Sequence, residues 1–163
     1  MKTIAVFLLF LAGTWAHMCM ISPPQRGSMT GINKPADCFV AACPDCGLVT
    51  GPCGLRPEPN KTTLALLAGS QYTVTIQKNL DHYDSASPGE FTISFRAGMT
   101  GDFTLLQKIP DIGEPSLTLY SVNITIPKPV GSDKGTLQAV YVTRNPQAPP
   151  MFYQCTDFII GVD

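Results

Sequence analysis

The sequence predicts an all-β protein, an antiparallel β-sandwich of immunoglobulin-like or fibronectin-like type with about seven strands and disulfide-stapled loops. The chain holds 15 prolines and 14 glycines in 163 residues, which interrupt long regular elements. Beyond the N-terminal segment, no apolar stripe follows the helical period. Short runs in which apolar and polar residues alternate recur instead, separated by turn-rich segments.

Residues 1–16 have the pattern of a secretory signal peptide. Lys2 forms a short positive region, residues 4–12 are apolar, and Thr14 and Ala16 are small residues at the positions a signal peptidase reads. We therefore expect cleavage between Ala16 and His17, and a secreted, extracellular chain in which residues 17–163 form a single domain.

Charge and hydropathy limit the partners of this domain. The formal net charge is −1, which does not favour binding to nucleic acid or to an anionic membrane surface. No second apolar stretch is long enough to span a membrane. We expect a soluble monomer.

All the cysteines follow the predicted cleavage point. An even number in an exported chain predicts a disulfide framework, and the sequence leaves its pairing open. The spacing of Cys43 and Cys46 also fits half a zinc site or a redox pair, but export and the lack of a nearby histidine favour a structural disulfide. We expect disulfides to order the loop-like residues 28–60. The six cysteines are Cys19, Cys38, Cys43, Cys46, Cys53 and Cys155.

Two short motifs match the acceptor pattern for N-glycosylation. They begin at Asn60 and Asn123, and each has threonine two residues later. Both asparagines are therefore predicted to lie on the surface of a glycoprotein.

The predicted strands follow one another at short intervals. Residues 71–77 and 91–96 alternate most clearly, with Phe91, Ile93 and Phe95 on one face. The remaining strands are expected at residues 63–67, 103–107, 117–126, 136–143 and 152–161. The loop 79–84 joins two of these strands at an end of the sandwich, and it contains His82.

His17 and His82 are the candidate metal ligands. Cleavage before His17 would free an α-amine beside its ring Nδ1, two nitrogens that can close on one ion. The chain contains two histidines in all, so His82 is the remaining imidazole. Three neutral nitrogens suit one copper ion. Because the amine, with a pKa of about 8, must lose its proton to bind, affinity should fall as pH falls. The alternative is that histidine stands at the cleavage point incidentally.

Three stretches resemble known copper proteins. The opening His17, followed by Ser-Pro-Pro-Gln-Arg-Gly at 22–27, resembles the start of lytic polysaccharide monooxygenases and their copper-binding relatives, in which the mature N-terminal histidine forms half of a histidine brace. Residues 152–157, Phe-Tyr-Gln-Cys-Thr-Asp, are similar to the last core strand of bacterial chitin-active monooxygenases and to the closing run of fungal copper-acquisition factors. Pro-Cys-Gly at 52–54 resembles the second group.

The resemblance implies roles for several residues. It makes His17 and His82 the copper ligands and places Phe152 on the axial side of the ion. In the acquisition factors an aspartate joins the two histidines, and Asp81 or Asp157 is the candidate here. Gln154 shares a strand face with Phe152. It is either a side chain beside the metal site, if the protein is an enzyme, or a buried amide bonded to backbone.

The residues after His17 are expected to hold it in place. Pro23 and Pro24 stiffen the segment, and Arg26 ties it to the sheet by hydrogen bonds. Cys19 is expected to anchor the segment through a disulfide, with Cys155 as its partner. Tyr83 is expected to pack or to lie on the rim of the site.

Three functions remain open. The first is copper handling without polymer cleavage, and the second is copper-dependent oxidation of chitin or a similar polysaccharide. The third is a secreted structural or adhesion module. The one tryptophan, Trp15, lies in the predicted signal peptide, which leaves no tryptophan for an aromatic platform on a polymer and favours copper handling.

Overall fold

The computed structural model describes residues 17–27, 43–98, 100–128 and 131–161. The predicted signal peptide and Cys38 lie outside these residues. The described residues form one 3₁₀ turn, η1 (Pro44–Cys46), and eight strands: β1 (His17–Ser22), β2 (Ala65–Leu67), β3 (Gln71–Leu80), β4 (Glu90–Ala97), β5 (Thr104–Pro110), β6 (Thr118–Thr125), β7 (Lys134–Val142) and β8 (Met151–Gly161).

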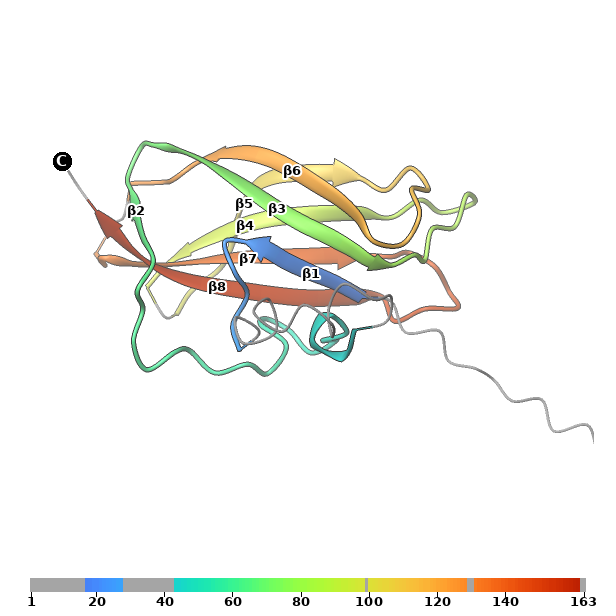
Figure 1. Cartoon of the computed structure of the whole chain (residues 1–163), viewed down its shortest axis with the longest axis horizontal. Helices are drawn as coiled ribbons and strands as arrows, with labels where there is room; N and C mark the ends of the chain where they lie inside the picture. Colours follow the sequence, from blue (N-terminus) through green and yellow to red (C-terminus); the bar gives the residue numbers. More distant parts are fainter. Residues whose placement is uncertain (1–16, 28–42, 99, 129–130, 162–163) are drawn as a thin grey trace, which may run out of the picture.

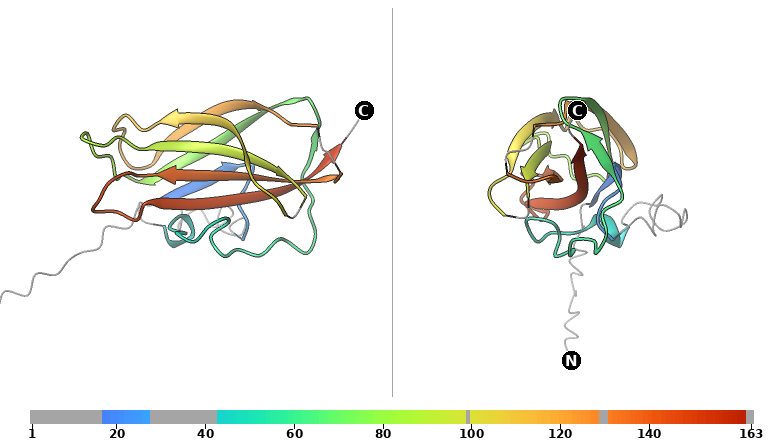
Figure 2. Two further views of the ribbon diagram at one scale, coloured as in Figure 1. Left: turned by 180° about the vertical axis from the view of Figure 1, so that it is seen from behind. Right: turned by 90° about the vertical axis from the view of Figure 1, so that its left-hand side faces the viewer.

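The strands form two sheets, ordered β1-β3-β6 and β2-β8-β7-β4-β5. All pairs are antiparallel except β2 with β8, which is parallel. In Figure 1, β1 lies between β3 and β8, and the end-on view in Figure 2 shows the strands curling around a common interior. The predicted β-sandwich is confirmed.

The alternating strands have the faces that the sequence predicts. Phe91 and Ile93 are fully buried, and Phe95 is nearly so. On β3, Val74 and Ile76 face the same core, while Thr73 lies outside. The Thr73 hydroxyl donates to Asn123 Oδ1 at 2.7 Å. Asn60 and Asn123 are both exposed, and their glycosylation stays a prediction.

The strand β1 was not expected, and its composition explains why. A half-exposed strand alternates in hydropathy, but residues 18–21 of β1 are all apolar. The structure covers both faces of this strand. Met18 and Met20 point into the main core, while Cys19 packs with η1 in a second, smaller cluster.

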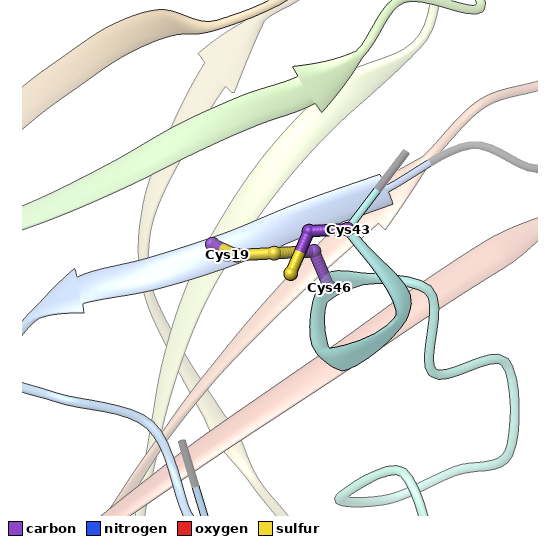
Figure 3. Close-up of side chains that lie close together, drawn as sticks. All are labelled: Cys19, Cys43 and Cys46. Carbon is purple, nitrogen blue, oxygen red and sulfur yellow. A yellow bond between two sulfur atoms is a disulfide. The ribbon is translucent and has the colours of Figure 1, made fainter. Parts of the chain in front are cut away.

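Two disulfides join described residues: Cys19 to Cys46 and Cys53 to Cys155. Cys43 is also disulfide-bonded, and its sulfur lies beside the Cys19–Cys46 pair (Figure 3). The expectation that Cys19 pairs with Cys155 is therefore wrong. The reason is direction, because Cys19 faces η1 whereas the Cys155 sulfur faces the loop at Pro52, 3.5 Å from its carbonyl oxygen. The structural use of Cys46 is confirmed.

Arg26 ties the N-terminal segment to β8, as predicted. Its Nε and Nη2 donate to the two carboxylate oxygens of Asp157 at 2.7 and 2.6 Å. Its backbone N–H donates to the carbonyl of Cys155 at 2.6 Å. Such a forked, charge-assisted pair fixes orientation as well as distance.

None of the described helical segments is long and apolar enough to cross a membrane.

Candidate metal centre

His17 begins β1, where the pairing with β3 is irregular. His17 lies opposite Leu80 and Met18 lies opposite Lys78, so Asn79 is the extra residue of a β-bulge. A bulge re-aims the side chains next to it. Met18 points into the core, while the His17 imidazole lies against Gly47 and the residue is 3% exposed.

The ring of His17 packs on Gly47, the residue after η1. A Cβ at position 47 would lie 2.5 Å from both Cδ2 and Nε2 of the ring. Gly47 has φ −93°, which any residue can adopt. Glycine is therefore needed here for the space of the histidine ring rather than for its backbone conformation.

Phe152 lies between His17 and the next aromatic residue inward. Its ring centroid is 6.3 Å from that of His17 and 6.4 Å from that of Tyr141. Phe152 is fully buried near the start of β8, opposite Tyr141 on β7. The predicted axial residue thus borders the predicted N-terminal ligand.

His82 lies in the loop after β3 and is 6% exposed. Two side chains hydrogen-bond the backbone of His82. Its backbone hydrogen-bonds the Tyr141 hydroxyl, and its carbonyl accepts from Asn145 Nδ2 at 3.1 Å.

The structure brings both histidines to one end of the sandwich. Leu80, opposite His17, precedes His82 by two residues. Since β3 ends at Leu80, the register places His82 just beyond the position that lies opposite His17. Phe152 and Tyr141 also link the two histidines: the Phe152 ring lies beside the rings of His17 and Tyr141, and the Tyr141 hydroxyl bonds the backbone of His82.

Asp81 is close to His82 but is already engaged. Its Oδ1 lies 2.5 Å from the Lys78 ammonium and accepts the backbone N–H of Tyr83 at 2.8 Å. Its side chain is 37% exposed.

Asp157 is not with the histidines. Its carboxylate accepts from Arg26 and, at 2.9 Å, from the Thr136 hydroxyl. It lies five positions after Phe152 on β8, which is roughly 16 Å at a strand rise of about 3.3 Å per residue.

Gln154 follows Phe152 on the inner face of β8 and is 1% exposed. Its Nε2 donates to the backbone carbonyl of Asp45 at 2.9 Å, and Gln25 Nε2 donates to the same oxygen at 2.8 Å. Gln154 thus has the backbone partner that the sequence left as one of its two alternatives.

Sequence reasoning missed the polar cluster behind His82. Lys78 and Asp111 are buried and joined at 2.7 Å, and Asp111 Oδ2 accepts from the Tyr141 hydroxyl at 2.5 Å. Burial, followed by the bond to Asp111, raises the pKa of Tyr141 well above its ordinary value. The signal was present, because alternation from Val74 and Ile76 puts Lys78 inside the sandwich.

No protein-family model matches the sequence, and a comparison with curated proteins found no match. Among solved structures, the AA15 lytic polysaccharide monooxygenase from Thermobia domestica in the Cu(I) state is similar, with a TM-score of 0.54 and 19% identity. The similarity covers 88% of this chain and 98% of that chain.

Two further structures score lower. A lytic polysaccharide monooxygenase important for chitin utilisation in Cellvibrio japonicus has a TM-score of 0.47 and 12% identity, and covers 89% of this chain and 100% of that chain. The superoxide reductase (neelaredoxin) from Ignicoccus hospitalis has 0.44 and 13%, covering 62% and 77%. Only the first score exceeds 0.5, and it shows that the chain has a fold like that of a lytic polysaccharide monooxygenase.

Proposed function

We propose that this is an exported copper-binding protein with a histidine brace. Removal of residues 1–16 frees the α-amine of His17. That amine and the ring Nδ1 of the same residue, together with the imidazole of His82, then hold one copper ion. The ring of Phe152 would border the same site.

The observation that carries this proposal is the β1–β3 register. In it His17 lies opposite Leu80, the residue two positions before His82. The donors fit the ion chemically, because three nitrogens of amine and imidazole type suit copper. Gly47 leaves room for the His17 ring. A copper ion held by these residues would supply one-electron redox chemistry.

We infer copper handling rather than polymer cleavage as the main role. The described surface beside the site offers no tryptophan, and Gln154 is bonded to backbone. Of the two candidate aspartates, Asp81 is the better placed, because it directly precedes His82, whereas Asp157 is bound by Arg26. In this proposal the ion is bound for transfer or storage.

Polysaccharide oxidation is the second candidate. It is favoured by the ring of Phe152 beside that of His17 and by the fold shared with the monooxygenase from Thermobia domestica. Chitin is the substrate class that the sequence resemblance suggests.

Copper titration of the secreted protein tests the proposal. We expect one Cu(II) per chain, and His82→Ala should weaken binding by about 100-fold, or about 2.7 kcal/mol. Tyr83→Phe, a change at the next residue, should bind as the wild type does. Unchanged affinity in His82→Ala would remove His82 from the site.

A separate assay distinguishes the two functions. The copper-loaded protein is incubated with chitin and a reductant, and the soluble products are analysed by mass spectrometry. Copper handling predicts no oxidised oligosaccharides, whereas their appearance in the wild type and absence in His82→Ala would establish the second candidate.

A further inference from the structure

The chain around His82 has left the sheet, so its backbone polar groups need partners of another kind. The N–H of Asp81 donates to the Ser116 hydroxyl at 2.9 Å. The backbone of His82 bonds the Tyr141 hydroxyl, and its carbonyl accepts from Asn145. Side chains from three separate segments thus hold this stretch, where a strand would use ladder bonds.

Lys78 lies at the centre of these supports. Its side chain is 0% exposed, and its ammonium contacts three oxygens: Asp81 Oδ1 at 2.5 Å, Asp111 Oδ1 at 2.7 Å and the carbonyl of Glu114 at 2.7 Å. An ammonium has three N–H donors. Each therefore has an acceptor, which is what a buried cation requires.

Two routes lead from Lys78 to His82. One is direct, through Asp81, the residue before the histidine. The other runs through Asp111, whose second oxygen accepts from the Tyr141 hydroxyl, and that hydroxyl bonds the backbone of His82. We propose that Lys78 is the positioning residue for His82. It fixes the backbone that aims the imidazole, by one route through Asp81 and by another through Asp111 and Tyr141.

This inference rests on the proposed function in one respect, that the aimed imidazole of His82 binds copper. Removing the Lys78 ammonium could then have either of two opposite effects on copper affinity. If Lys78 orients His82, removing the ammonium misplaces a ligand and weakens copper binding. If Lys78 merely withholds Asp81 from the ion, removing it frees a carboxylate ligand and strengthens binding.

The test compares Lys78→Met and Asp81→Asn with the wild type in the mature protein. Removing a partner that orients a metal ligand typically lowers affinity 10–100-fold, so we expect a loss of at least about tenfold with a changed electron paramagnetic resonance spectrum. Asp84→Asn is the matched control, since within the described part of the chain its carboxylate bonds the turn at Ala86 and Ser87. Equal or tighter binding by Lys78→Met would overturn the proposal.

A measurement without metal keeps the test independent of copper. In Asp81→Asn, Lys78 retains Asp111 and Glu114, so the fold should persist. We expect amide hydrogen exchange of His82 to accelerate in this variant while amides of β4 and β7 stay protected. Unchanged exchange at His82 both in this variant and in Lys78→Met, which breaks both routes, would contradict the positioning role. Should the wild type bind no copper, the proposed function fails, and the exchange data still decide the role of Lys78.

Discussion

The ring of Phe152 lies 6.3 Å from the ring of His17, although 135 positions of sequence separate the two residues. β1 and β8 contact each other across the two sheets, and each contributes one of these rings near its own first residue. The histidine that cleavage would expose is therefore already seated against the last strand of the core.

This contact predicts the effect of Phe152→Leu. Leucine keeps an apolar side chain but has three fewer carbon atoms, so the cost in stability should be on the order of 1–3 kcal/mol. Loss of the ring should alter the copper resonance spectrum. Phe158→Leu, at another fully buried position of β8, should leave that spectrum unchanged. Identical spectra for wild type and Phe152→Leu would refute the axial assignment.

Gly47→Ala should disturb the His17 ring directly. The added Cβ would lie 2.5 Å from two ring atoms, so the ring must move. Overpacking of this kind costs about 1–3 kcal/mol, which corresponds to roughly 5–150-fold in copper affinity if the cost falls on the bound state. Gly161→Ala is the control, because the nearest atom to its Cβ would be 3.6 Å away. Calorimetric titration measures both, and equal affinities would show that the ring does not need this space.

Asp157→Asn should destabilise the fold without weakening copper binding. Arg26 is 7% exposed at its side chain and would lose the nearer of its two carboxylate partners, since Glu58 lies 3.5 Å from Nη2 and Asp157 lies 2.6 Å from it. A hydrogen bond to a charged group contributes about 1.5–3 kcal/mol, and we expect a loss of about that size in urea unfolding. Glu90→Gln, where the carboxylate pairs with the exposed side chains of Lys108 and Arg144, should cost less than about 1 kcal/mol per pair. A drop in copper affinity for Asp157→Asn would instead make this aspartate a ligand.

Alkaline pH should destabilise the fold through Tyr120. Burial, together with its hydrogen bond to Glu114, raises the pKa of Tyr120 above the value of 10.0 that it has when unfolded. The folded state keeps the phenol proton where the unfolded chain loses it, so stability is complete below pH 10 and falls as pH rises above it. Urea unfolding between about pH 8 and 11 should show a shallower decline for Tyr120→Phe. Parallel curves for both proteins would be inconsistent with the raised pKa.

The sequence predicts the sandwich because alternation at positions such as Phe91, Ile93 and Phe95 reports which face is buried. It misses β1, since Met18, Cys19 and Met20 are covered on both faces and do not alternate. Disulfide partners depend on side-chain direction in the folded chain, so the sequence does not reveal that Cys19 pairs with Cys46. The sequence predicts which histidines could be metal ligands because the chain contains only two. Their supports through Lys78 and Tyr141 depend on contacts between distant segments.

The most direct test of the histidine brace changes only the N-terminus. Cu(II) electron paramagnetic resonance is recorded for the protein that begins at His17 and for the same protein with one glycine added before His17. The extension turns the α-amine of His17 into an amide while every side chain remains. The brace predicts a type 2 spectrum with three nitrogen ligands for the first protein and its loss in the second. The same spectrum from both proteins would contradict the account.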